Sequence, residues 1–197
     1  MTEETRPTRK LDWKKNIVMY LKDINLYLII IMITFLLVFR IVVVSGTSMN
    51  MTLMDGDYLL LVNNMFYRNP EPGDVIVASK ESYDDGVPIV KRVIATEGQT
   101  VDIINGIVFV DGKAVEEDYL TPGLSTHSSG GVVFPVTVPN GCVFVLGDNR
   151  SNSRDSRYPD IGMIDEREIL GKAFLVILPG TNRDTVERDF SRLGAID

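Results

Sequence analysis

Residues 101–110 read Val-Asp-Ile-Ile-Asn-Gly-Ile-Val-Phe-Val, two apolar runs joined by Asn105-Gly106. Asn-Gly supplies the positive φ angles of a type I′ turn, whose twist matches that of two paired strands. The stretch therefore predicts a β-hairpin with strands over residues 100–104 and 107–110. Val110-Asp111-Gly112-Lys113 indicates a second turn directly after it.

Further runs rich in Val, Ile, Leu or Phe lie on both sides of the hairpin, separated by turn residues. Such side chains favour strands, so the chain beyond residue 45 is predicted to be a mainly β domain with an antiparallel sheet. The predicted strands are residues 58–62, 74–78, 89–95, 132–138, 142–146 and 170–178. Residues 121–131 have the composition of a loop, and the charged tail 182–197 fits either a short helix or an irregular end.

Residues 24–44 are almost wholly apolar, interrupted by Asn25 and Arg40. At about 1.5 Å per residue the run spans roughly 30 Å, the thickness of a bilayer's hydrocarbon core. It is longer than the apolar region of a cleaved signal peptide, and no A-x-A-like site closes it, which favours a membrane anchor. Basic residues precede it, and short basic flanks stay cytoplasmic; they are Arg6, Arg9, Lys10, Lys14, Lys15 and Lys22.

We therefore expect a cytoplasmic segment over residues 1–23, one transmembrane helix over 24–44, and an extracytoplasmic β-rich domain over 45–197. The 197 residues, 45% hydrophobic and 24% charged, allow one domain of moderate size plus this anchor. A net charge of −7 argues against nucleic acid as the main partner, because a phosphate backbone selects for clustered Lys and Arg.

The chain has one cysteine and one histidine. Cys142 alone excludes an intramolecular disulfide and CxxC-type metal sites, and its apolar neighbours favour core packing. His127 lies in the loop-like stretch and is expected at the surface. A nucleophile in this chain would therefore need a base other than histidine.

Ser48 lies four residues beyond Val44, the last apolar residue of the predicted span. A serine that attacks a carbonyl needs a base within reach, here Asp, Glu or Lys, and donors for the oxyanion. Strand alternation places Lys91 on one face with Ile89 and Val93, and an apolar setting lowers a lysine pKa. The pKa would have to fall by about 3 units from about 10.4, a difference of roughly 4 kcal/mol. The alternative is a lysine whose stem packs on the sheet while its ammonium reaches water.

Residues 147–157 read Gly-Asp-Asn-Arg-Ser-Asn-Ser-Arg-Asp-Ser-Arg after an apolar strand. This density of hydroxyls, carboxylates and guanidiniums is unusual for a plain turn. A hydrogen-bonded loop, in which Asp and Asn cap backbone amides and Arg pairs with Asp, would explain several of these residues equally well.

In this order the motifs resemble those of bacterial type I signal peptidases, the membrane-anchored Ser/Lys endopeptidases that remove signal peptides from exported proteins. Ser48-Met49-Asn50-Met51-Thr52-Leu53 resembles the family's S-M-x-P-T-L box, and residues 56–62 resemble the G-D-x-x-L-V strand after it. Residues 72–77 are similar to its G-D-V-V-V run and residues 91–94 to its K-R-V segment. Residues 147–157 are similar to G-D-N-R-x-N-S-x-D-S-R.

The resemblance implies that Ser48 is the nucleophile and Lys91 the general base. It also implies that Ser153 orients the lysine amine and that Asp155 steadies the loop around it. The other loop residues with an implied supporting role are Asp148, Asn149, Arg150 and Arg157. The Ser48 backbone amide would be one oxyanion donor, and a second would have to be the Gly46 amide or be missing.

The resemblance further implies a substrate strand between the segment leading to Ser48 and the strand around Ile89, with small pockets for alanine-like side chains. The implied substrate-binding residues are Val44, Met49, Leu53, Ile89 and Val90. No metal or organic cofactor is implied. The implied partners are signal peptides of exported preproteins and the lipid bilayer, which places the protein in the cell membrane.

Four positions depart from the family pattern: Met51 replaces a proline, and Ala95, Glu97 and Gln99 replace a glycine, a proline and an aspartate. None of them is a proton-transfer group in that pattern, so activity is expected to survive. These departures are the support for a second hypothesis, a catalytically silent, membrane-tethered β domain that binds signal peptides or other partners. A third, a Ser/Lys self-cleaving repressor, is disfavoured because such proteins carry a DNA-binding domain instead of a membrane span.

Overall fold

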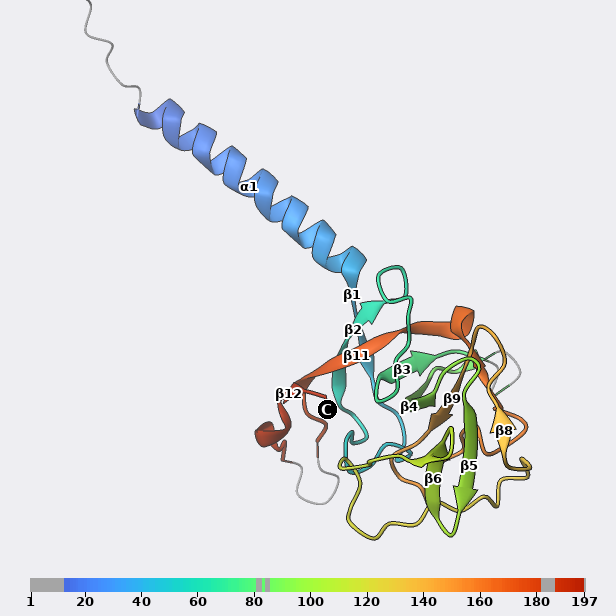
Figure 1. Ribbon diagram of the computed structural model, residues 1–197. Coiled ribbons are helices and arrows are strands. Elements are labelled where there is room, and N and C mark those ends of the chain that lie inside the picture. Colours follow the sequence, from blue (N-terminus) through green and yellow to red (C-terminus); the bar gives the residue numbers. More distant parts are fainter. Residues whose placement is uncertain (1–12, 81–82, 84–85, 182–186, 197) are drawn as a thin grey trace, which may run out of the picture. The chain divides into compact units, whose positions relative to one another are not determined.

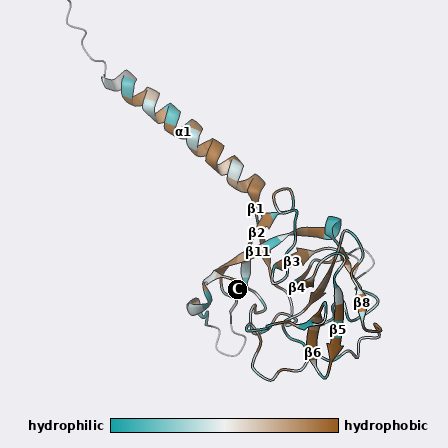
Figure 2. Cartoon of the chain, viewed as in Figure 1, coloured by the Kyte–Doolittle hydropathy of each residue, from teal (hydrophilic) through white to brown (hydrophobic). Residues whose placement is uncertain are grey.

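The computed structural model describes residues 13–80, 83, 86–181 and 187–196, and the chain divides after Leu37 into two units (Figure 1). The first unit consists of helix α1 (Trp13–Val38), whose last residue opens the second unit. Within α1, Asn16–Val38 is long and apolar enough to cross a membrane, with a mean hydropathy of 2.1. Figure 2 shows the second half of this helix as predominantly hydrophobic. The basic residues Arg6, Arg9 and Lys10 of the predicted flank lie outside the described residues.

The helix ends earlier than residues 24–44 predicted. Phe39–Val43 form strand β1, which pairs antiparallel with β2 (Tyr58–Asn63) from Phe39 opposite Val62 to Val43 opposite Tyr58. The prediction was wrong at this end because a run of Ile and Val satisfies the length criterion for a membrane helix but prefers a strand when a partner is available. Arg40 accordingly lies in β1 and not in the helix.

Among the described residues, eight strands form one large antiparallel sheet in the order β1-β2-β11-β3-β4-β9-β10, with β12 beside β11 (Figure 1). The members after β2 are β3 (Val75–Ala78), β4 (Ile89–Ala95), β9 (Cys142–Leu146), β10 (Ile164–Asp165), β11 (Ile169–Leu178) and β12 (Gly194–Ala195). Two short 3₁₀ helices, Glu166–Glu168 and Phe190–Arg192, precede β11 and β12. The described part of the charged tail is therefore neither an α-helix nor wholly irregular.

A second sheet has the order β7-β6-β5-β8 in the described chain. Its strands are β5 (Thr100–Ile104), β6 (Ile107–Val110), β7 (Lys113–Ala114) and β8 (Val136–Thr137). The predicted hairpin is confirmed, with φ angles of 51° at Asn105 and 83° at Gly106. The predicted strand 132–138 is confirmed only at β8, because Pro135 has no N–H to donate to a ladder and the Val132 amide donates to the Arg157 carbonyl instead.

Alternating side chains of the large sheet form its core. Leu59 and Leu61 of β2, Val75 and Val77 of β3 and Val176 of β11 are buried in one cluster. Cys142 is half-buried beside a neighbouring cluster, and His127 is exposed in a loop, as predicted. Desolvation by burial raises the pKa of the Cys142 thiol. The sheet thus presents β4 as a rigid strand next to the turn that carries Ser48.

Candidate active site

Lys91 and Ser48 meet in the structure. The Lys91 Nζ atom donates hydrogen bonds to Ser48 Oγ at 2.8 Å and to the Val90 carbonyl at 2.9 Å. Lys91 is only 4% exposed, so its ammonium does not reach bulk water as the alternative from sequence required. Burial lowers the pKa of Lys91 to about 8, although the Asp155 and Asp148 carboxylates act in the opposite direction. A buried amine with this pKa can accept a proton near neutral pH.

The turn that carries Ser48 is held by the loop after β9. The Asn149 backbone amide donates to the Ser48 carbonyl at 3.0 Å, and Asn149 Nδ2 donates to the Thr47 carbonyl at 3.0 Å. Gly147 lies so close that a Cβ there would be 2.5 Å from the Ser48 carbonyl oxygen and 2.1 Å from Ser153 Oγ. Only glycine fits at this position, which explains the first residue of the loop motif.

Asp155 and Arg157 form a buried ion pair within this loop. Arg157 donates to both carboxylate oxygens of Asp155, at 2.7 and 2.8 Å, and the two side chains are 4% and 0% exposed. The Gly147 amide donates to the same carboxylate at 3.0 Å. Asp155 therefore joins the first residue of the loop to its last.

Asp148 anchors the loop to β4 through Arg92, a residue that the sequence analysis did not assign to the site. Arg92 donates to the two oxygens of Asp148 at 3.0 and 2.8 Å, and Thr52 Oγ1 donates to Asp148 Oδ2 at 2.5 Å. Arg92 is 1% exposed and Asp148 is 0% exposed. The sequence did show a basic residue directly after Lys91 in a predicted strand. An arginine buried in a strand needs a carboxylate partner, so Arg92 could have indicated an ion pair at the site.

Arg192 in the C-terminal tail was also missed. Its guanidinium donates to Asp57 at 3.0 and 2.6 Å, and the Met54 and Gly180 amides donate to the same carboxylate, each at 2.7 Å. Asp57 is fully buried. The tail therefore fixes the far end of the turn that begins at Ser48, a contact between residues 135 positions apart that no local pattern indicates.

Ser153 differs from its predicted role. Its Oγ atom is buried and has no hydrogen-bond partner among the residues that the structure describes. Lys91 Nζ donates to Ser48 and Val90 instead, while Ser153 Oγ lies against Gly147. The predicted bond from Ser153 to the lysine amine is thus absent from this arrangement.

The two predicted oxyanion donors differ in whether their N–H is already hydrogen-bonded. No residue in the described part of the chain accepts a hydrogen bond from the Ser48 amide, so this N–H remains available for an oxyanion. The Gly46 amide donates to Asp55 Oδ1 at 2.8 Å, so of the two predicted alternatives, a Gly46 donor or a missing one, this arrangement favours the second. A carboxylate acceptor wins because it is the strongest partner for a backbone amide.

The residues predicted to bind substrate fall into two groups. Val44, Met49 and Leu53 are at most 4% exposed and belong to the core beneath the Ser48 turn. Ile89 and Val90 are half-buried at the start of β4. Strand β9 pairs with β4 only from Arg92 onward, so among the described strands these two residues pair with β3 alone. They therefore leave an open strand edge beside Lys91.

The backbone conformation at Met51 explains why this position does not hold the family's proline. Its φ angle is +97°, whereas a proline ring fixes φ near −65°. We expect Met51→Gly to raise the melting temperature, because it removes strain of about 1 kcal/mol, and Met51→Pro to lower both melting temperature and activity. Thermal unfolding of the two variants checks this. A proline variant at least as stable and active as the parent would show that this turn has another backbone conformation.

A β-sheet domain that buries a lysine amine against a serine hydroxyl defines a class of serine hydrolase. The comparisons agree with that class: a family model described as signal peptidase, peptidase S26, matches residues 17–178. The chain belongs to this family and is a serine endopeptidase of the signal peptidase I type.

Several similar proteins come from bacteria. Signal peptidase I of Bacillus amyloliquefaciens is 34% identical over 188 residues, which cover 91% of this chain and 96% of the relative. Signal peptidase I T of Bacillus subtilis (strain 168) is 33% identical with the same coverage. The crystal structure of a signal peptidase I from Enterococcus faecalis V583 is 29% identical, covering 53% of this chain and 96% of that one, with a TM-score of 0.44.

Proposed function

We propose that this peptidase cleaves N-terminal signal peptides from exported preproteins with Ser48 as nucleophile and Lys91 as general base. The observation that carries the proposal is the 2.8 Å hydrogen bond between Ser48 Oγ and the buried Lys91 Nζ. The distance lies within the range required for direct proton transfer, and burial depresses the pKa of the amine in the direction that a base requires.

The reaction has two steps. Neutral Lys91 takes the Ser48 proton as Oγ attacks the scissile carbonyl, and the ammonium then gives a proton to the departing amine. Lys91 next takes a proton from water as the water oxygen attacks the acyl ester, and the ammonium returns that proton to Ser48 Oγ as the ester bond breaks and the carboxylic acid product leaves. The Ser48 amide stabilises the oxyanion in both steps.

The open edge of β4 is the proposed seat of the substrate. The Val93 amide donates to the Asp74 carbonyl on the β3 side, so by alternation Val90 directs its backbone groups to the opposite side, which has no strand partner among the described residues and where Lys91 Nζ donates to the Val90 carbonyl. A signal peptide in extended conformation would add a strand there, beside Lys91. Ile89 would lie at its edge, and Val44, Met49 and Leu53 would lie in the core directly beneath the pockets for its side chains.

The proposed location is the cell membrane, with a cytoplasmic N-terminus and an extracytoplasmic catalytic domain. Helix α1 supports the membrane part, and the outward face of β1 adds to it. Ile41 and Val43 are 58% and 48% exposed and share one face of the strand, whereas Val42 and Val44 lie on the opposite face, towards the core. An apolar outer face on a strand that directly follows the span fits contact with lipid.

Activity should depend on pH through Lys91. The neutral amine is the active form, so kcat/KM should rise with pH through about pH 8, where the pKa of Lys91 lies. At pH 7 the rate should be about tenfold below its plateau. Initial rates on a preprotein in detergent, measured from pH 6 to 10 with enzyme stability checked at each pH, give the profile. A rate that does not change between pH 7 and 9 would exclude Lys91 as the base.

The orientation is testable by labelling in intact cells. In a Cys142→Ser background, Val133→Cys should react with a membrane-impermeant maleimide, because Val133 is 85% exposed in the catalytic domain. Thr5→Cys should react only after the cells are permeabilised, since it precedes the span. The reverse pattern would place the catalytic domain in the cytoplasm.

A further inference from the structure

The segment after β7 returns from the small sheet to the loop around the proposed active site. Val115 closes the sheet by donating its amide to the Val108 carbonyl, and Leu120 is buried. Between them, Glu116 and Asp118 are exposed while Glu117 and Tyr119 are half-buried. The alternation turns one acidic and one aromatic side chain towards the protein interior.

Tyr119 packs on Arg92, the residue that holds Asp148. The guanidinium carbon of Arg92 lies 3.9 Å from the centre of the Tyr119 ring. This separation is short for a cation–π contact, and at a desolvated site such a contact contributes substantially. Because Arg92 also donates to Asp148 and to the Gly73 carbonyl, the ring covers a guanidinium whose hydrogen-bonding positions are already in use.

Glu117 and the Tyr119 hydroxyl fix a second guanidinium. Arg150 Nη2 donates to Glu117 Oε1 at 2.6 Å and to the Tyr119 hydroxyl at 3.2 Å, and that hydroxyl donates to Glu117 at 2.9 Å. The Arg150 side chain is 0% exposed, so Glu117 is the carboxylate that balances its charge. Arg150 in turn donates through Nε to the Gly147 carbonyl at 3.1 Å.

Both guanidiniums end in the loop that holds the Ser48 turn, at Asp148 and at the neighbouring Gly147. Arg92 fixes Asp148, and Arg150 fixes Gly147, which packs directly against the Ser48 carbonyl. A rigid network of this kind keeps a nucleophile within the narrow range of positions that reaction requires.

We propose that Tyr119, together with Glu117, is a positioning residue of this peptidase: it holds Arg92 and Arg150 in place and through them the backbone around Ser48. This role rests on the proposed Ser48–Lys91 mechanism. Neither residue touches the reacting atoms, and the segment directly follows the last residue that bonds to the small sheet, Val115, so it links that sheet to the proposed active site.

The test compares Tyr119→Leu and Tyr119→Phe in the full chain. Tyr119→Leu removes the ring over Arg92 and the hydroxyl, and should lower kcat by roughly 10- to 100-fold while KM changes less than about threefold. Tyr119→Phe retains the ring and should lose less. Because a loosened Arg92 neutralises Asp148 less well, the acid limb of the pH profile should move to higher pH in Tyr119→Leu.

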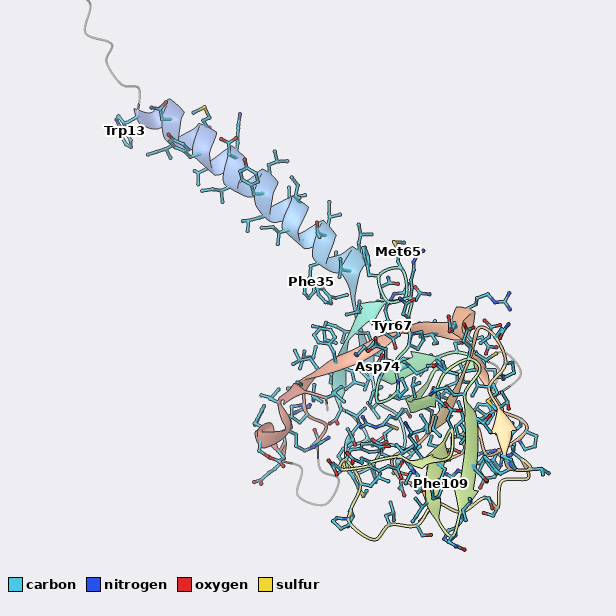
Figure 3. All side chains as sticks on the ribbon, in the orientation of Figure 1. Trp13, Phe35, Met65, Tyr67, Asp74 and Phe109 are labelled. Carbon is cyan, nitrogen blue, oxygen red and sulfur yellow. The ribbon has the colours of Figure 1, made fainter. Side chains whose placement is uncertain are left out.

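Tyr67 provides a matched control, because its hydroxyl donates to Asp74 at 2.6 Å and not to Glu117 (Figure 3). Tyr67→Leu should lower the melting temperature as Tyr119→Leu does, but it should leave kcat and the pH profile unchanged. If the two leucine variants have equal kcat at equal loss of stability, Tyr119 is only structural. If Tyr119→Leu does not fold, a Tyr119→Phe variant with parental kcat and pH profile overturns the proposal. If Ser48→Ala remains active while Tyr119→Leu loses kcat, the Ser48 mechanism fails and the segment positions another nucleophile.

Discussion

Replacing Ser48 by alanine and, separately, Lys91 by methionine should each lower kcat for preprotein cleavage by about 10⁴-fold or more, since either change removes a group that forms or breaks bonds. The double variant should be no worse than the single ones, because the two side chains act as one unit. Cleavage of a purified preprotein by the full chain in detergent measures all three.

Although Lys91→Met should abolish activity, it should raise the folding stability of the protein. Burial lowers the pKa of Lys91 to about 8 from its ordinary value of 10.5, so the folded state disfavours the charged amine. This cost is fully present below pH 8, falls as pH rises from about 8 to 10.5, and is absent above that range. It is on the order of 3 kcal/mol, and methionine removes it. The variant should therefore melt at a higher temperature than the parent at pH 7, and the difference should shrink towards pH 10.5.

Matched controls are Ser45→Ala, an exposed serine three residues before Ser48, and Lys113→Met, an exposed lysine in β7. Both should retain parental kcat and stability. Cleavage at the parental rate by Ser48→Ala and Lys91→Met would exclude the dyad. A parent that is inert where a control peptidase is active would instead favour the catalytically silent binding domain.

Asp155→Ala should cost about 3–5 kcal/mol of folding stability, because it leaves the Arg157 guanidinium buried and unpaired. It should also lower kcat by roughly 100-fold, since the Gly147 amide loses its acceptor and the residue against Ser48 is released. The Asp155 carboxylate raises the pKa of Lys91, so the acid limb of the variant should move to lower pH. Denaturant unfolding and pH–rate profiles measure the two effects separately.

The double variant Asp155→Ala/Arg157→Met separates charge balance from positioning. Removing both partners of a buried pair is often close to neutral, so stability should return to within about 1–3 kcal/mol of the parent, the remainder being the unsatisfied Gly147 amide. Activity should stay low, because the loop is still untied. If kcat returns together with stability, Asp155 contributes only to folding. Arg154→Met in the exposed pair with Asp160 is the control and should change neither quantity.

Much of the fold was predictable from local pattern. The Asn105-Gly106 turn fixed a hairpin because few residues tolerate its φ angles, and alternation placed Lys91 on the same face of β4 as Ile89 and Val93. Local pattern failed where a distant partner decides the outcome. Residues 39–43 continue the apolar run, but they pair with β2 in the sheet, and the predicted strand 132–138 is shortened to β8, with the Val132 amide donating to Arg157.

The candidate site divides in the same way. The resemblance to the family singled out Ser48, Lys91 and the loop from Gly147 to Arg157, whereas the residues alone left the base open among Asp, Glu and Lys. The ties of Arg92 to Asp148 and of Arg192 to Asp57 were not predicted, since each joins residues far apart in the chain. Nor did the sequence show that Asp55 occupies the Gly46 amide or that Ser153 Oγ has no partner among the described residues.

By itself, then, the sequence determined the groups present: a serine, a lysine with apolar neighbours, a loop of ion pairs and an apolar span. The order of these groups along the chain also indicates the family to which the protein belongs. Only the tertiary structure decided which amides remain available, how far Lys91 is from Ser48, and which strand edge is open. Those properties depend on burial and on hydrogen-bond partners, and both are set by residues distant in sequence that the fold brings together.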